Sequence, residues 1–156
     1  MTGLRTRPRI LGVDFGRARI GLSLSDELQL LAHPLKTIPA SRGATKEIAE
    51  IVRDNNVARV VVGLPRHMSG EIGLAAKEAL GFAAELRDLL VCEVVTWDER
   101  LTTVAANRAL RNLGHKTKNS KKVVDQVAAQ MILQGYLDSL QAVECDKPGM
   151  LSRPDD

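Results

Sequence analysis

The chain has 156 residues, of which 44% are hydrophobic and 26% are charged, a balance typical of one globular domain with a single hydrophobic core. Lys and Arg number 22 against 19 Asp and Glu, so the formal net charge of +3 excludes a strongly basic coat for nucleic acid but not a local basic patch. The four aromatic residues are too few for a surface that stacks the bases of single strands. No apolar run approaches the length of a membrane span and no apolar segment follows Met1, so we expect a cytoplasmic protein with neither a membrane anchor nor a secretory signal.

Apolar runs predict five strands, at residues 10–15, 20–25, 33–39, 57–64 and 91–97. Apolar residues at helical spacing predict four helices, at residues 41–55, 74–90, 102–113 and 120–140. Residues 1–8 are expected to form a loose arm and residues 142–156 a loose tail, which leaves a single domain over residues 9–141. Cys92 lies in an apolar run and Cys145 in the polar tail, which favours reduced thiols over a disulfide.

The order of these elements predicts an α/β fold. Three leading strands form an antiparallel meander and the later strands alternate with helices, which gives a five-stranded mixed sheet flanked by helices on both faces. Pro34 and Pro39 bracket the third strand, so we expect that strand at an edge of the sheet. Residues 57–64 form a continuous run rich in Val, typical of a strand that is covered on both faces.

Asp14 lies near the end of the first predicted strand, in an otherwise apolar run between Gly12 and Gly16. A carboxylate in such a strand needs a partner or must lose its charge. The two glycines would allow a ligand to approach the backbone closely. The alternative is an Asp that accepts hydrogen bonds in the turn of a hairpin, and Asp14 by itself does not decide between the two.

Asp98 and Glu99 follow the last predicted strand and precede a helix, the place where open α/β sheets have their ligand crevice. The alternation of side chains along a strand puts Glu99 on the same face as Trp97, and Asp98 on the opposite face. The alternative is a pair of acids that only stabilises the start of the following helix through its dipole.

Asp125 lies on the apolar face of the last predicted helix, in register with Ala128 and Ala129. These small residues would let the helix pack close to the sheet. A buried lone carboxylate is unfavourable, so a cation, a hydrogen-bond donor or a metal should face Asp125. The alternative is an ion pair with Lys121 or Lys122 in the same helical turn.

Asp14, Glu99 and Asp125 come from three separate elements and together offer oxygen ligands without His or Cys, a set that suits Mg²⁺ or Mn²⁺. Two such ions can activate a water and stabilise the leaving oxygen of a phosphodiester. If the three acids converge, they are candidate metal ligands and catalytic residues of a nuclease.

The segment from Arg100 to Lys122 carries seven basic and no acidic side chains, whereas the rest of the chain carries 15 basic and 19 acidic ones. Such asymmetry suggests a polyanion partner, although a solvated loop and helix face is the commoner reason for a charge run. Arg66 lies in a glycine-containing loop that could present N–H groups to a phosphate or could be a plain connection. The candidate substrate-binding residues are Arg66, Arg100, Lys116, Lys118, Lys121 and Lys122.

Four motifs in order resemble the YqgF family, the pre-16S ribosomal RNA nucleases that are also described as Holliday junction resolvases. The resemblance covers about residues 9–140. Its motifs are Leu11–Gly16 with Arg19–Gly21, Val62–Pro65 with Gly70, Asp98–Thr103, and Lys122–Asp125 with Ala128, Ala129 and Leu133. It implies an RNase H-like fold, metal ligands at Asp14, Glu99 and Asp125, and maturation of the 5′ end of ribosomal RNA more strongly than junction resolution.

The partners that we expect are structured RNA, such as a precursor rRNA on the ribosome, or branched DNA, with no membrane, and the protein is a monomer or a weak homodimer. A resolvase of four-way junctions would use the same residues but needs two sites, and therefore a symmetric dimer. A non-catalytic RNA-binding factor of the same fold is a further alternative. An ATP-binding domain of the actin and sugar-kinase type would need a second lobe that 156 residues do not supply.

Overall fold

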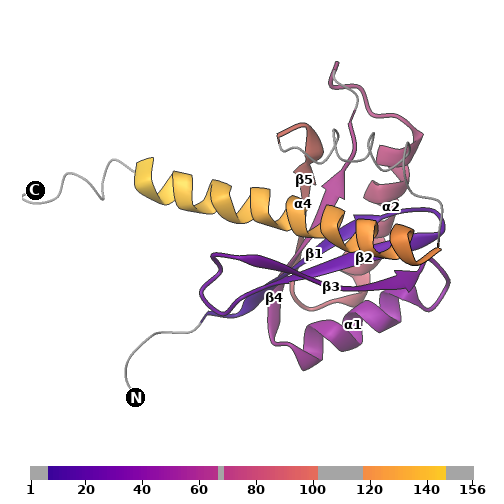
Figure 1. Cartoon of the computed structure of the whole chain (residues 1–156), viewed down its shortest axis with the longest axis horizontal. Coiled ribbons are helices and arrows are strands. Elements are labelled where there is room, and N and C mark those ends of the chain that lie inside the picture. Colours follow the sequence, from indigo (N-terminus) through magenta and orange to yellow (C-terminus); the bar gives the residue numbers. More distant parts are fainter. Residues whose placement is uncertain (1–6, 67–68, 102–117, 147–156) are drawn as a thin grey trace, which may run out of the picture.

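The computed structural model describes residues 7–66, 69–101 and 118–146 (Figure 1). Five strands form one sheet in the order β3-β2-β1-β4-β5. The strands are β1 (Arg9–Phe15), β2 (Arg19–Ser25), β3 (Ala32–Pro39), β4 (Val57–Leu64) and β5 (Glu93–Asp98). The helices are α1 (Ala44–Asp54), α2 (Leu74–Leu89) and α4 (Lys118–Asp146), and a short 3₁₀ turn, η1 (Glu99–Leu101), follows β5.

The pairing of the strands confirms the predicted α/β architecture. Strand β1 runs antiparallel to β2, and β2 antiparallel to β3, while β4 is parallel to both β1 and β5. The three leading strands therefore form a meander, and the later strands are joined through helices. Strand β3 lies at the edge of the sheet, as predicted. Its two prolines lack a backbone N–H, which an edge strand tolerates because one of its sides has no neighbouring strand.

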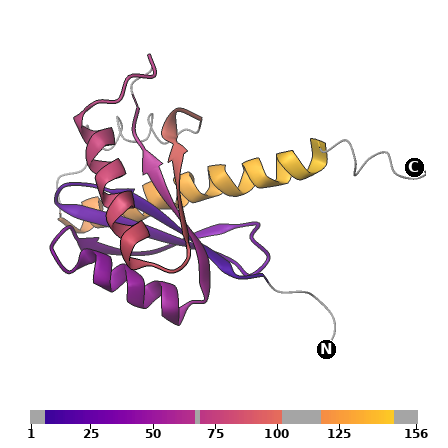
Figure 2. The same cartoon turned by 180° about the vertical axis from the view of Figure 1, so that it is seen from behind.

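Helices cover both faces of the sheet, and each face has its own core (Figures 1 and 2). Helices α1 and α2 lie on one face, where the larger core includes Ile48, Phe82 and Leu86. Helix α4 crosses the other face, mainly over the first three strands, and its C-terminal end extends beyond the sheet. The smaller core there is formed with Ile132 and Leu133.

Helix α4 lies very close to the sheet because small residues line the crossing. The hydroxyl of Ser23 on β2 donates a hydrogen bond to the carbonyl oxygen of Ala129 at 2.7 Å. A Cβ atom at Gly12 on β1 would lie 2.8 Å from the Cβ atom of Leu133 and would also collide with Ser23. The predicted close approach at Ala128 and Ala129 is confirmed, since both are buried.

Several predicted boundaries differ from the observed ones. Strand β5 begins at Glu93 and not at residue 91, because Val91 is fully exposed in a bend. Helix α4 begins at Lys118, two residues before its predicted start, and continues to Asp146, so the predicted tail is helical over residues 142–146. No Gly or Pro interrupts this stretch before Pro148, and its residues are compatible with a helix.

Three further predictions lie wholly or mostly outside the described residues. They are the helix at residues 102–113, the first six residues of the N-terminal arm and the last ten residues of the tail. Among the helices that the structure describes, none is both long and apolar enough to cross a membrane.

Candidate active site

Asp14 lies between two glycines on the face of the sheet that α4 covers. It is paired directly with Gly21 on β2. On the other side, Val13 pairs with Val62 of β4, so the next residue of β4 beside Asp14 is Gly63. Asp14 is only 4% exposed. Its carboxylate is therefore removed from bulk water but has no side chain directly beside it on either neighbouring strand.

Helix α4 brings Asp125 to the first of these glycines. A Cβ atom at Gly21 would lie 3.1 Å from the Cβ atom of Asp125 and would overlap the main chain of that residue. Any side chain at this position would thus push the helix away. Asp125 is 6% exposed, as its position on the apolar face of the helix predicts.

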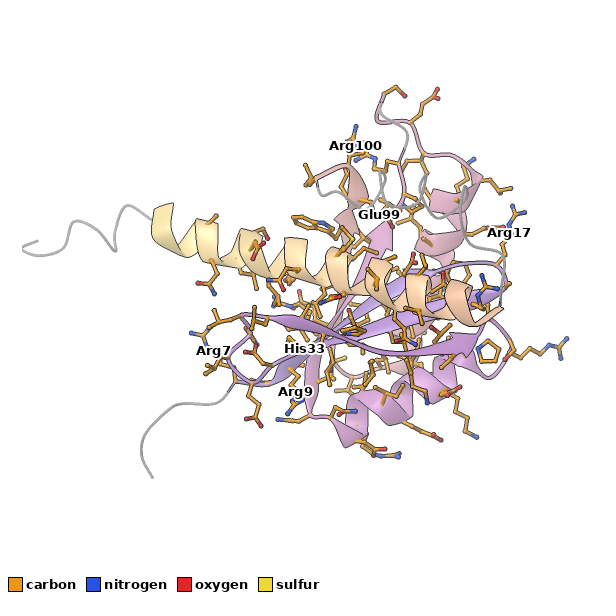
Figure 3. All side chains as sticks on the ribbon, viewed as in Figure 1. Arg7, Arg9, Arg17, His33, Glu99 and Arg100 are labelled. Atoms are coloured by element: carbon orange, nitrogen blue, oxygen red, sulfur yellow. The ribbon has the colours of Figure 1, made fainter. Side chains whose placement is uncertain are left out.

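The turn after β5 brings Glu99 to the second glycine. Glu99 is the first residue of η1 and is 2% exposed. Its Oε2 atom lies 2.6 Å from the place that a Cβ atom of Gly63 would occupy, and Ile132 of α4 contacts the same place. Figure 3 shows Glu99 and Arg100 at the end of the molecule where β5 finishes.

The predicted catalytic acids Asp14, Glu99 and Asp125 are thus all buried on one face of the sheet, along the row Gly21–Asp14–Gly63. Each comes from a different element, and each glycine of the row makes room for one of the outer acids. Among the described residues, however, no group of three His, Cys, Asp or Glu side chains is already arranged as a metal cage. The structure brings the acids to one region without closing them on a common point.

Arg19 is a site residue that the sequence analysis did not single out for a role. Its Nε atom donates to Oδ2 of Asp125 at 2.8 Å, across 106 positions of sequence. The expectation that a cation faces Asp125 is confirmed, although the cation comes from β2; the side chains of Lys121 and Lys122 lie outside the described residues. The signal was strand alternation, which places Arg19 on the same face as Gly21.

Asp98 has different surroundings from its neighbour Glu99. Arg100 donates to its carboxylate from Nη2 at 2.7 Å and from its backbone N–H at 3.0 Å, and Arg66 lies 3.5 Å away. Hydrogen bonding from Arg100 holds the pKa of Asp98 below its ordinary value, and burial opposes this effect only in part. Asp98 is therefore a stable anion that is already engaged by two guanidinium groups.

The predicted substrate-binding residues are only partly described. Arg66 and Arg100 lie together at the ends of β4 and β5. Lys118, Lys121 and Lys122 occur in the first turns of α4, but their side chains lie outside the described part, as does the whole of Lys116. The proposal that these lysines contact phosphates remains a prediction.

Comparisons with known proteins agree with this arrangement. Residues 8–139 match the family described as RuvX, Holliday junction resolvase. A relative from Halalkalibacterium halodurans is 44% identical over 85% of this chain and 98% of its own length, and one from Chloroflexus aggregans is 49% identical over 83% and 93%. Both carry the name "Putative pre-16S rRNA nuclease".

Solved structures show the same fold at low sequence identity. RuvC of T. thermophilus in complex with a Holliday junction substrate aligns with a TM-score of 0.53 and 14% identity, over 86% of this chain and 96% of that chain. A second structure of Thermus thermophilus RuvC aligns with a TM-score of 0.52 and 15% identity, over the same shares of the two chains. The mixed sheet is thus that of an RNase H-like protein. Because the family match spans all five strands and most of α4, the chain belongs to the RuvX family, which is also called YqgF.

Proposed function

We propose that this chain is a metal-dependent endonuclease that processes the 5′ end of pre-16S rRNA in the cytoplasm during ribosome biogenesis. The observation that carries the proposal is the position of Asp14, Glu99 and Asp125. Three carboxylates, each at most 6% exposed, occupy one face of the sheet in a chain whose relatives carry the name of an rRNA nuclease. A structural role alone does not require three acids to share a buried region.

The chemistry of these side chains fits a divalent ion. Carboxylate oxygens without His or Cys suit Mg²⁺ or Mn²⁺, and Asp14, Glu99 and Asp125 are the residues that would hold it. When bound, the ion supplies an activated water and charge stabilisation at the scissile phosphate. Because the described side chains do not form a closed cage, the proposal requires the carboxylates to rotate toward the ion as it binds.

The remaining residues of the site act on the substrate and on the acids. Arg66 and Arg100 both contact Asp98, which directly precedes Glu99, and can hold phosphate oxygens. The lysines of the basic segment, Lys116, Lys118, Lys121 and Lys122, contribute contacts to the phosphate backbone that carry no sequence information. Arg19 keeps the carboxylate of Asp125 oriented on the site face.

A resolvase of four-way DNA junctions is the second candidate. The description of the matching family favours it, and a junction substrate is present in the T. thermophilus RuvC structure. Cleavage of both opposing strands of a junction requires two active sites, so this activity predicts a stable symmetric dimer. Sedimentation at micromolar concentration is therefore informative: a monomer disfavours the resolvase.

One experiment separates the candidates. The protein is incubated with an rRNA precursor and with a four-way DNA junction, each with Mg²⁺ and with Mn²⁺. We expect cleavage of the precursor by the wild type and by Asp88→Asn, which changes an exposed acid on the opposite face, and none by Asp14→Asn. Cleavage of the junction alone supports the resolvase, and RNA binding without turnover under either metal leaves only a binding factor.

A further inference from the structure

Arg66, Asp98 and Arg100 form a compact cluster at the ends of β4 and β5. The Nε atom of Arg100 lies 3.0 and 3.1 Å from the two carboxylate oxygens of Asp98, in addition to the shorter contact from Nη2. Arg66 approaches the same Oδ2 atom with Nη1, at 3.5 Å. One carboxylate is thus shared by two guanidinium groups that come from different loops.

Gly70 lies close to both guanidinium groups. Arg66 donates to the carbonyl oxygen of Gly70 from Nη2 at 2.7 Å and from Nε at 3.2 Å. A Cβ atom at Gly70 would lie 3.4 Å from Nη1 of Arg100 and 3.8 Å from Nη2 of Arg66. The φ angle of Gly70 is +95°, a conformation that other residues rarely adopt, so this position stays without a side chain.

The charges of this cluster do not cancel. Two guanidinium groups and one carboxylate leave a net charge of about +1, since Arg stays protonated. The side chain of Asp98 is 17% exposed, whereas those of Arg66 and Arg100 are 32% and 27% exposed. The two arginine side chains are therefore more exposed than the acid that they share. The carboxylate of Asp98 balances only one of these two positive charges, so a second anion that contacts both guanidinium groups would be bound favourably.

We infer that Asp98 is a positioning residue, which fixes Arg66 and Arg100 as one phosphate-binding pair beside the acid site. The ligand is a phosphodiester group of the nucleic acid, because planar guanidinium groups bind phosphate oxygens through paired N–H donors. Asp98 directly precedes Glu99, so the phosphate lies next to the acids. This role rests on the proposed nuclease function for its purpose, but the binding can be measured without cleavage.

The test uses the sign of an electrostatic effect. Asp98→Asn makes the protein more positive, so a merely solvated acid at this position would bind RNA more tightly once neutralised. The positioning role predicts the opposite, because the two arginines lose their common anchor. We expect binding roughly three- to tenfold weaker, the size of a lost charge-assisted hydrogen bond at a partly exposed site.

The measurement is fluorescence anisotropy of a labelled RNA stem-loop with a single-stranded 5′ flank, in EDTA and over a range of salt concentrations. Arg66→Gln and Arg100→Gln should each reduce the salt slope by about one unit or slightly less. Arg53→Gln, which removes an exposed arginine of α1 on the opposite face, is the matched control and should leave the slope nearly unchanged. In the Arg66→Gln/Arg100→Gln double variant, Asp98→Asn should no longer weaken binding.

Three results would overturn the inference. The first is tighter RNA binding by Asp98→Asn, and the second is equal weakening by Asp98→Asn with and without the two arginines. The third is loss of Mn²⁺ binding in Asp98→Asn by calorimetry to the extent seen in Glu99→Gln, because Asp98 would then be a metal ligand. Should Asp98→Asn fail to fold, the two single arginine variants still decide whether the pair binds phosphate. A wild type that binds RNA in EDTA but never cleaves it contradicts the proposed function and leaves this inference standing.

Discussion

The ion pair between Arg19 and Asp125 joins β2 to the first half of α4, and one of its partners is almost removed from water. The side chain of Asp125 is 8% exposed and that of Arg19 is 29% exposed. A carboxylate buried near two other acids is stable only if a positive charge faces it. At the scale of single residues, Arg19 thus supplies the charge that a bound divalent ion would also supply.

Removing Arg19 should therefore be more harmful than neutralising its partner. Arg19→Gln removes a positive charge that faces the buried carboxylate of Asp125 and should lower the free energy of unfolding by about 1–3 kcal/mol in EDTA, less than for a fully buried pair because Arg19 is partly exposed. Asp125→Asn should cost less, because an amide oxygen still accepts a hydrogen bond from Arg19. Urea denaturation of both variants and of the double variant checks this order.

Metal provides the control for that prediction. Millimolar Mn²⁺ should restore more stability to Arg19→Gln than it adds to the wild type, because the ion faces the same carboxylate that the guanidinium group faced. If Asp125→Asn proves the more damaging change, or if Mn²⁺ does not distinguish Arg19→Gln from the wild type, then Arg19 does not have this role.

At the scale of elements, the site depends on how closely α4 approaches the sheet. Gly21 lies against the main chain of Asp125, so the contact involves backbone that cannot move without displacing the helix. Gly81 in α2 is the opposite case, since nothing lies within 4 Å of a Cβ atom built at that position. Gly21 is thus required by close packing and Gly81 is not, and alanine substitution at each position tests this difference.

Gly21→Ala should destabilise the protein by about 1–3 kcal/mol through overpacking, and should also weaken Mn²⁺ binding because Asp125 moves away from Asp14. Gly81→Ala should stabilise the protein by about 0.5–1 kcal/mol, because it removes a flexible residue from the interior of a helix without a clash. Thermal melting and Mn²⁺ calorimetry measure both. Normal metal binding in a folded Gly21→Ala protein would show that the helix position is not critical.

The local pattern of apolar residues was enough to predict most elements of this fold, but its accuracy at the element boundaries varied for physical reasons. Strand β4 was predicted with its observed bounds, because a short continuous run rich in Val is typical of a strand that is covered on both faces. The start of β5 was wrong, because hydrophobicity alone does not reveal that Val91 is exposed. The end of α4 was placed too early, because the helix continues beyond the sheet, where packing on the sheet no longer marks it in the sequence.

The acids of the candidate site were predictable from the sequence, whereas the ion pairs that they form were not. Asp14 and Asp125 stood out because each interrupts an apolar pattern, which is a local signal. The pair of Arg19 with Asp125 depends on where α4 crosses β2, and the sharing of Asp98 by two arginines depends on the neighbouring ends of β4 and β5. Such contacts follow from tertiary packing: strand alternation indicates the face on which Arg19 lies, but it does not indicate which residue Arg19 contacts.

At the scale of the whole molecule, the acid site exists only when the chain is folded. Asp14 comes from the first strand, Glu99 from the turn after the last strand, and Asp125 from the C-terminal helix. The positive segment between Arg100 and Lys122 connects the last two of these elements. In the proposed function the carboxylates hold a metal and the cations hold phosphates, which is the electrostatic arrangement that a nuclease requires.

The central claim is that the three acids serve a metal and not the stability of the fold. Carboxylates that share a buried region repel one another, so neutralising Asp14 should leave the metal-free protein as stable as the wild type or slightly more stable. If Asp14 were only a hydrogen-bond acceptor in the hairpin, Asp14→Asn should instead cost about 1–3 kcal/mol, with or without metal.

The most direct test is the shift in melting temperature that millimolar Mn²⁺ produces relative to EDTA. We expect a clear rise for the wild type and for the control Asp88→Asn, and a much smaller rise for Asp14→Asn, with the melting temperature of Asp14→Asn in EDTA at or above that of the wild type. A lower melting temperature of Asp14→Asn in EDTA, together with a rise in Mn²⁺ as large as that of the wild type, would contradict the assignment of Asp14 to a metal site.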